Sequence, residues 1–282
     1  MRRLPGVLGL LISAMIWGLS WWPLQRLQRL GVDPLWSTSL LFSGVVVAIS
    51  LIQPQAWVAL WRSRRLWLVL LVSGLTNTLF NLGITTGDVV RVVLLFYLMP
   101  VWIVPIAWLV LREPVSGQRL LQLVVATSGA LVVLWPDAAH ASLHLQAGDW
   151  MGLLAGVCFA LNTVLLRHDP DADRGGRVLA MFLGSSLIAT VLALGLTVPA
   201  LPPPRPEWLA LACGLAGLYL ISNLAMQHGA SALPANVSAV IMLTEVLWAT
   251  GSSVWLGAGH ASLRLLLGGA LIVGSATLAA LE

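Results

Sequence analysis

The side chain with the clearest capacity for chemistry is Glu245. It is the only charged residue among the 56 that lie between Glu207 and Arg264. An acid at the centre of a lipid bilayer costs about 2.5 to 3.5 kcal/mol on insertion scales, so it must face protein or water. We expect Glu245 to exchange a proton or to attract a cation. The alternative is a structural acid whose oxygens are bonded by Thr244, Thr250 or a neighbouring helix.

Two sets of polar side chains recur at every fourth residue, a spacing that places each set on one face of a helix. A shift of 142 residues pairs Asn77 with Tyr219, and Asn81 with Asn223. We expect the two sets to line a substrate-binding cavity, Asn81 and Asn223 most of all. Hydrogen bonds between helices, worth about 0.6 kcal/mol each in membrane bundles, are the alternative. The sets are Ser73, Asn77 and Asn81 in the first half and Tyr219, Asn223 and Gln227 in the second.

Three aromatic side chains have faces that can stack on a flat or cationic substrate: Trp17, Tyr97 and Trp248. The chain has fourteen tryptophans, so most of them must be packing or interface residues instead. Asn162 adds a further amide to the candidates. The predicted substrate-binding residues are therefore Trp17, Asn77, Asn81, Tyr97, Asn162, Tyr219, Asn223, Glu245 and Trp248.

The sequence predicts no catalytic residue, metal ion or cofactor. His140 and His144 are four residues apart but have no third ligand beside them. Asp169, Asp171 and Asp173 imitate the start of a calcium-binding loop, yet Arg174 occupies the position where the sharp turn needs glycine. A glycine-rich phosphate loop, a Ser-His-Asp set and paired intramembrane acids are all missing from the sequence, so we expect a protein that is not an enzyme.

The elements that position these residues are predicted to be membrane-spanning helices. Of the 282 residues, 59% are hydrophobic and 9% are charged, and the mean hydropathy is +0.91. The arginines cut the chain into charge-free stretches of membrane-crossing length. Because peptide groups in hydrocarbon must be bonded within the protein, and no alternating barrel pattern occurs, the stretches predict helices. The fold class is an all-α polytopic membrane protein with ten transmembrane helices. The predicted helices cover residues 5–24, 34–54, 66–85, 92–111, 120–135, 150–166 and 178–198, followed by three more helices.

The distribution of the fifteen arginines predicts the topology. If the N-terminus is cytoplasmic, ten arginines lie on the inner side and five on the outer side, which favours both termini inside a cell (inner) membrane. The basic residues occur singly or in small groups between apolar runs, so we expect no nucleic acid partner. The partners we do expect are the lipid bilayer and a small-molecule substrate, and the working expectation for the oligomeric state is a monomer.

The chain contains the same unit twice. Residues 14–24 align with 156–166 at a shift of 142, while Val101 aligns with Val246 and Gly129 with Gly274 at a shift of 145. Five helices in each copy require the second copy to enter the membrane inverted. We predict a first five-helix repeat over residues 1–137, an outer linker over 138–149 and a second repeat over 150–282. Such repeats place a binding site at their interface near the middle of the bilayer.

Several short motifs resemble those of EamA-type transporters in the drug/metabolite transporter superfamily. The fourth and fifth helices carry Leu98-Met99-Pro100-Val101-Trp102, Leu111-Arg112-Glu113-Pro114-Val115-Ser116 and Gly129. Ile16-Trp17-Gly18-Leu19 and Leu243-Thr244-Glu245-Val246 resemble the first and ninth helices. The chain has Val246 where the family often has proline, and residues 257–260 lack a counterpart of Glu113. The resemblance implies ten helices, a central cavity and export of small metabolites or amino acids.

Together these observations predict a secondary transporter that exports small metabolites such as amino acids by alternating access. Coupling to protons through Glu245 is a further hypothesis. The first alternative is efflux of lipophilic cations or drugs, with Glu245 as the counter-charge. The second is a membrane scaffold that does not transport.

Overall fold

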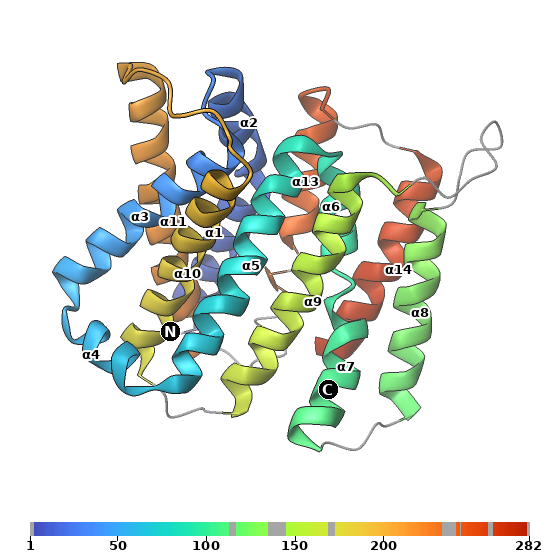
Figure 1. Cartoon of the computed structure of the whole chain (residues 1–282). Coiled ribbons are helices and arrows are strands. Elements are labelled where there is room, and N and C mark those ends of the chain that lie inside the picture. The colour runs from blue at the N-terminus through green and yellow to red at the C-terminus, as the bar shows by residue number, and fades with distance from the viewer. Residues whose placement is uncertain are drawn as a thin grey trace.

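The computed structural model describes residues 3–112, 117–134, 145–168, 173–232, 241–242, 244–258 and 262–280. Within these ranges the regular structure is helical throughout, as predicted (Figure 1). The helices are α1 (Arg3–Leu19), α2 (Trp21–Arg29), α3 (Pro34–Ile52), α4 (Gln55–Arg62), α5 (Arg64–Thr86), α6 (Val89–Phe96), α7 (Met99–Leu111), α8 (Gly117–Leu134), α9 (Ala147–His168), α10 (Arg174–Gly195), α11 (Pro206–Ala232), α13 (Thr244–Trp255) and α14 (Leu263–Ala280).

Seven segments of the described chain are long and apolar enough to cross a membrane. Each predicted helical segment coincides with helix in the structure, but two of them are divided: the first into α1 and α2, the fourth into α6 and α7. The ten-helix inverted repeat and the repeat boundaries remain predictions. The seven segments are Leu4–Arg29, Pro34–Ile52, Arg64–Thr86, Val89–Leu111, Ala147–Leu166, Arg174–Gly195 and Pro206–Met226.

Short polar residues fix the starts of four helices. The side chain of Asp33 accepts a hydrogen bond from the Leu35 amide at 2.8 Å, and Asp88 accepts one from the Arg91 amide at 2.9 Å. Ser63 and Asp173 cap α5 and α10 in the same way. Each cap satisfies an amide that the first turn of a helix leaves without a partner. The polar breaks between apolar runs therefore decide where the helices begin.

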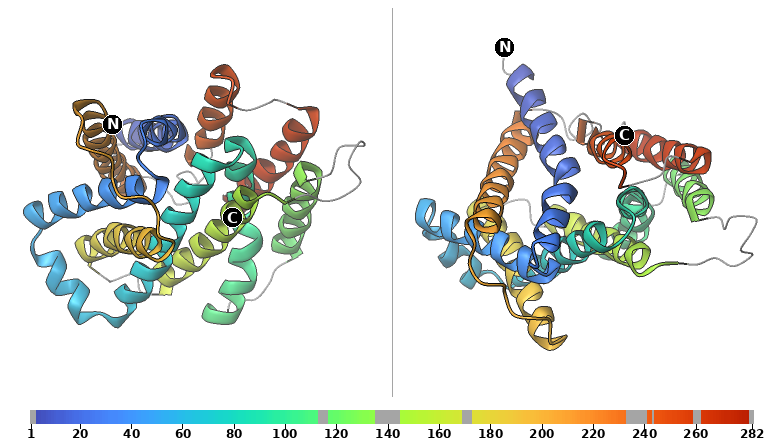
Figure 2. Two further views of the ribbon diagram at one scale, coloured as in Figure 1. Left: turned by 45° about the horizontal axis from the view of Figure 1, so that its top comes forward. Right: turned by 90° about the horizontal axis from the view of Figure 1, so that it is seen from above.

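The helices pack mainly against helices from the other half of the chain (Figure 2). Helix α1 lies along α11, α3 along α10, α5 along α9 and α10, and α8 along α14. Between these helices lies a shared core of aliphatic and aromatic side chains. The halves are therefore interleaved, and neither forms a separate core.

Glycines allow α9 to approach α6 closely. A Cβ on Gly152 of α9 would lie 2.7 Å from the Val92 carbonyl oxygen, and one on Gly156 would lie 2.8 Å from that of Phe96. Gly148 precedes them by one turn and meets Gly87 at 2.9 Å by the same measure. Small residues spaced by four are a common means of bringing helix backbones together in membranes. This glycine stripe holds α9 against α6.

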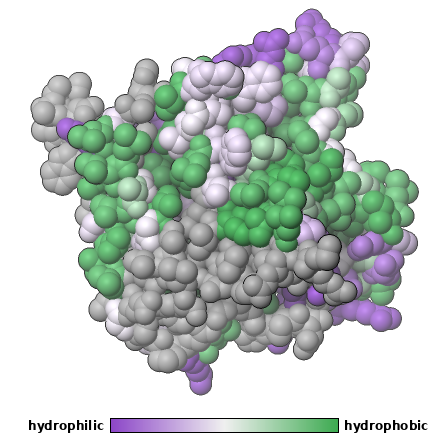
Figure 3. Space-filling view, turned by 180° about the vertical axis from the view of Figure 1, so that it is seen from behind, coloured by the Kyte–Doolittle hydropathy of each residue, from purple (hydrophilic) through white to green (hydrophobic). Residues whose placement is uncertain are grey.

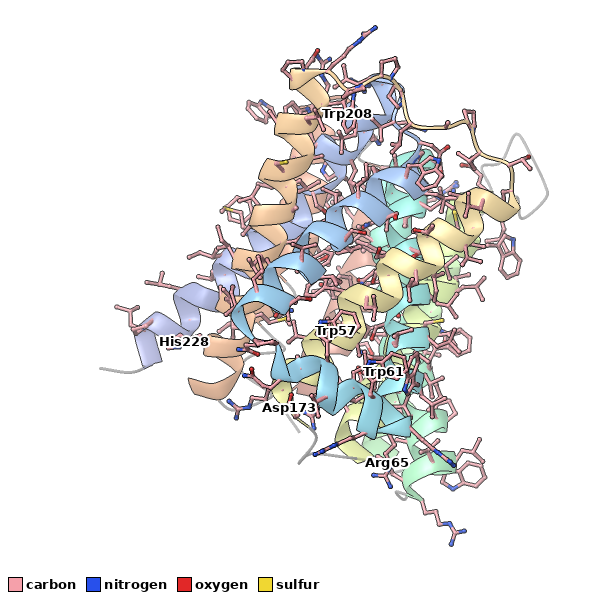
Figure 4. The ribbon with its side chains drawn as sticks, turned by 60° about the vertical axis from the view of Figure 1, so that its left-hand side comes forward. Trp57, Trp61, Arg65, Asp173, Trp208 and His228 are labelled. Atoms are coloured by element: carbon pink, nitrogen blue, oxygen red, sulfur yellow. The ribbon has the colours of Figure 1, made fainter. Side chains whose placement is uncertain are left out.

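The surface has the distribution expected of a bundle in lipid. Many large apolar side chains are exposed, among them Leu51, Val191 and Leu247. Seen from behind, hydrophobic residues cover a broad area at mid-height and hydrophilic residues gather at the top (Figure 3). Trp208 lies at one end of the bundle, while Trp61 and Arg65 lie at the other (Figure 4). The start of α1 and the end of α14 both lie in the lower half of Figure 1, the half that contains α4.

Candidate functional site

The buried acid Glu245 is bonded to a residue of the opposite half. Its side chain is 7% exposed, and its Oε2 accepts a hydrogen bond from the Tyr97 hydroxyl at 2.9 Å. The same hydroxyl lies 3.4 Å from the Met242 carbonyl oxygen. Thr244 bonds instead to the Ile241 carbonyl oxygen at 2.7 Å. The partner of Glu245 is therefore a phenol from a neighbouring helix. A purely structural acid that is bonded by a neighbouring helix would make the same kind of contact.

Tyr97 reaches Glu245 because the fourth predicted helix is interrupted at this residue. Helix α6 ends at Phe96, and α7 begins at Met99 with Pro100 in its first turn. Proline has no amide hydrogen, so Pro100 cannot donate to the Phe96 carbonyl as a continuous helix requires. That carbonyl faces Gly156 of α9. Pro100 thus creates a helix break, which leaves the Phe96 carbonyl without its helical partner and takes Tyr97 off the regular helical path.

Gly18 brings α1 against the backbone that carries Glu245. A Cβ at Gly18 would lie 2.7 Å from the Glu245 carbonyl oxygen, 2.7 Å from the Cβ of Trp248 and 3.1 Å from the Ala249 nitrogen. Two of these three atoms belong to the backbone of α13 and cannot turn aside. Any side chain at position 18 would therefore displace α13 and the acid with it.

An aromatic stack lies beside this contact between α1 and α13. Trp17 stacks on Tyr219 of α11 with ring centroids 4.6 Å apart, and Tyr219 stacks on Phe42 of α3 at 5.4 Å. The hydroxyl of Tyr219 lies near Ser20 and Glu245 but makes no hydrogen bond of good geometry with the described residues. A buried phenol without a partner is rare and favours a ligand or a rearrangement at that point.

The amides fall into two groups. Asn81 is fully buried; its Nδ2 donates to Thr38 at 3.3 Å, while its Oδ1 has no partner among the described residues. Asn77 donates to Ser185 of α10 at 2.8 Å, and Asn162 accepts from Ser73 at 3.0 Å. Asn77 and Asn162 are thus used in helix-to-helix contacts, which is the alternative that their spacing left open. Asn81 keeps bonding capacity for a ligand.

The remaining candidates differ in exposure. Asn223 is buried in α11, whereas Trp248 of α13 is 42% exposed and its ring is not among the stacked pairs of the described residues. The side chain of Gln227 lies outside the described residues. So do His140, His144, Asp169, Asp171, Glu113 and Leu243. In the described ranges no group of three or more His, Cys, Asp or Glu residues is suited to a metal ion.

Sequence reasoning missed several residues of this region. Gly18 was part of a motif, but its close approach to α13 was not foreseen. Phe42, Ser20 and Thr38 gave no signal because isolated hydroxyl and aromatic residues are common in apolar helices. A shared depth in the bundle could have identified these residues, but the depth of a residue is known only after the helices have been paired.

The helices and the buried acid define a multi-pass membrane protein with a polar centre between its two halves. Residues 4–135 match the EamA-like transporter family, so this part of the chain is an EamA-like transporter domain of the drug/metabolite transporter superfamily. Curated proteins give no match. One solved structure, described only as a crystal structure of a protein, is similar with a TM-score of 0.64 and 18% identity, covering 99% of this chain and 97% of that chain. The shared fold thus extends over both halves.

Proposed function

We propose that the protein is a secondary transporter that moves a small amphipathic metabolite, such as an amino acid, out of the cell by alternating access. The observation that carries the proposal is the hydrogen bond between Tyr97 and Glu245. It joins an interrupted helix of the EamA-like domain to an acid of the second half, and transporters built from inverted repeats hold their cargo where the two repeats meet.

The helix boundaries support an inverted repeat around this bond. Helix α5 begins at Arg64 and α11 at Pro206, which are separated by the predicted shift of 142 residues. The starts of these two helices therefore agree with the predicted alignment to the residue. We place the site at the junction of these copies.

The charge environment of Glu245 suits an exchange between cargo and proton. In the described part of the chain Glu245 has no ion pair, and Arg91 is engaged by Asp149 at 2.7 Å. A buried carboxylate with only a neutral donor beside it is stabilised either by binding a proton or by binding the cationic group of a ligand. The two compete for one site, so the protein exchanges one for the other.

The aromatic and amide groups complete the proposed site. Trp17 offers a ring face to an apolar or cationic part of the cargo, while the hydroxyl of Tyr219 and the free Oδ1 of Asn81 offer hydrogen-bonding groups. Tyr97 and Glu245 hold the end that carries charge. Asn77 and Asn162 contribute by fixing α5 against α10 and α9. Efflux of lipophilic cations is the second candidate, favoured by the same uncompensated acid.

We propose that the protein lies in the cell membrane with both termini in the cytoplasm. The ten-to-five division of arginines supports this orientation, and the ends of the described chain lie toward the same end of the bundle (Figure 1). A tag at each end, tested for protease access in intact cells and in inverted vesicles, decides the orientation.

The proposal is tested in proteoliposomes with a panel of amino acids and cationic dyes, with and without a pH gradient. Transport by the parent protein is expected to depend on pH, and Glu245→Gln is expected to remove this dependence. Asn81→Ala is expected to weaken substrate affinity more than folded yield, and Asn77→Ala to do the reverse. An unaltered pH profile in Glu245→Gln would rule out coupling through this acid. A protein that transports no member of the panel would favour the scaffold.

A further inference from the structure

The short helix α4 was not predicted as a helix, and it is held firmly at one end of the bundle. Its buried residues Ala56 and Leu60 face the start of α10. A Cβ on Gly176 of α10 would lie 2.9 Å from the Cβ of Ala59, so the two helices touch through a glycine. The indole nitrogen of Trp57 donates to Ser50 at 2.9 Å and fixes α4 to the end of α3.

The outward side of α4 combines apolar and basic groups. Trp61 is 67% exposed and packs edge-on against Trp67 with ring centroids 5.1 Å apart. Val58 beside it is also exposed, as are Leu51 and Ile52 at the end of α3. The exposed arginines of this segment are Arg62, Arg64 and Arg65, and Arg174 is exposed at the start of α10, which packs against α4. We name this set of residues (Val58, Trp61, Arg62, Arg64, Arg65 and Arg174) the α4 corner.

The α4 corner belongs to two segments that contain more basic than acidic residues. Asp173 lies at the same end of the bundle (Figure 4), and its carboxylate caps α10, with Oδ2 accepting from the Gly176 amide at 2.6 Å. Residues 55–65 and 167–177 together contain six arginines and three aspartates. The segment therefore keeps an excess of positive charge where tryptophans mark the interface between lipid and water.

We propose that the α4 corner binds an acidic phospholipid of the surrounding leaflet. The arginines hold the phosphate and the anionic headgroup, because guanidinium groups match phosphate oxygens in geometry and charge. Trp61, with Val58 and the end of α3, receives the upper part of the acyl chains. A free anion would contact only the arginines, whereas a lipid contacts the arginines with its headgroup and Trp61 and Val58 with its acyl chains. The lipid anchors α4 and, through Gly176, the start of α10.

The experiment compares matched losses of charge at the two ends of the bundle. The full chain, stripped of lipid in detergent, is titrated with phosphatidylglycerol or phosphatidylcholine of identical acyl chains, and bound lipid is counted by native mass spectrometry. The variant is Arg62→Gln/Arg64→Gln, and the control is Arg29→Gln/Arg205→Gln, whose exposed arginines belong to the end marked by Trp208. The first pair of substitutions is expected to weaken phosphatidylglycerol binding about 30-fold. Each arginine contributes about 1 kcal/mol, and 1.4 kcal/mol corresponds to a factor of ten in affinity. The control pair is expected to leave it unchanged.

A second measurement uses a variant that keeps every charge. Brominated phosphatidylglycerol is expected to quench the fluorescence of Trp61, obtained as the difference between the parent and Trp61→Phe, more than brominated phosphatidylcholine does. Inorganic phosphate in excess is expected to leave the quenching unchanged. Equal quenching by the two lipids, equal losses in the two charge variants, or displacement by inorganic phosphate would each overturn the proposal.

Discussion

Replacement of Gly18 by alanine is predicted to disconnect the buried acid from its tyrosine. The added Cβ would stand 2.7 Å from the Glu245 carbonyl oxygen, while ordinary contact begins near 3.4 Å. The difference requires α1 and α13 to separate by about 0.7 Å. The hydrogen bond from Tyr97 to Glu245 is 2.9 Å long. A displacement of this size is enough to lengthen it to about 3.6 Å, beyond a useful hydrogen bond.

The expected loss of stability follows from two opposing effects. Overpacking of a closed helix contact costs about 1 to 3 kcal/mol, and alanine in place of glycine returns about 0.5 to 1 kcal/mol by favouring the helix. The net expectation for Gly18→Ala is a loss of about 1 to 2 kcal/mol. Gly251→Ala on α13 is the matched control, because a Cβ there meets no atom of the described residues within 4 Å.

Thermal unfolding in detergent and transport in proteoliposomes measure the two consequences. Gly18→Ala is expected to unfold at a lower temperature and to transport several-fold more slowly, whereas Gly251→Ala is expected to match the parent or to unfold slightly later. A Gly18→Ala protein with the parent's unfolding temperature and transport rate would refute the reasoning, because the contact would then be loose enough to accept a methyl group.

Three further substitutions test the contacts around the site. Tyr97→Phe leaves the Glu245 Oε2 without a donor, at an expected cost of about 1 to 3 kcal/mol. Transport should fall when Tyr97→Phe is made in the parent protein but not when it is added to Glu245→Gln. A fall in both proteins would mean that Tyr97 does not act through the acid. Arg91→Gln leaves Asp149, whose side chain is 3% exposed, without its cation at a cost of about 3 kcal/mol; addition of Asp149→Asn should restore part of the unfolding temperature, and no restoration would argue against the ion pair. Gly152→Ala should reduce folded yield on size-exclusion chromatography, because its Cβ meets the opposing backbone at 2.7 Å; unchanged yield would mean that the glycine stripe is not tightly packed.

The sequence predicted the helices well because charge and capping residues mark their ends. The predicted segment 34–54 matches α3 closely, and Asp33 caps α3 where the segment begins. The segments 92–111 and 178–198 begin three and four residues after α6 and α10, because these helices start at the caps Asp88 and Asp173 and include arginines in their first turns. Helix α4 was missed because its eight residues are too few for a membrane-length pattern. Its tryptophans and arginines predicted only an interface segment.

The candidate site was predictable in its members but not in its pairings. Tyr97 and Glu245 were both named, yet they are 148 residues apart, and their bond depends on a helix break that Pro100 only suggests. The period of Asn77 and Asn81 identified a helix face without identifying what that face meets. One of these amides bonds to α10 and the other to α3. Periodicity carries no information about the neighbouring helix, so it could not separate these roles.

The contact between α3 and α10 differs in kind from the glycine contact between α6 and α9. Two hydroxyl pairs cross it, Ser39 with Thr190 and Ser43 with Ser186, each at 2.6 Å. Thr190 also donates to the Ser186 carbonyl oxygen at 2.8 Å, which leaves Ser39 as the donor in the first pair. The pair of Ser43 and Ser186 has no fixed polarity, since both protons can reverse without moving a heavy atom. Small rotations of one helix against the other therefore need only a change of hydroxyl torsion. The bundle thus contains one helix contact that tolerates small rotations, between α3 and α10, and one that backbone contact keeps rigid, between α6 and α9.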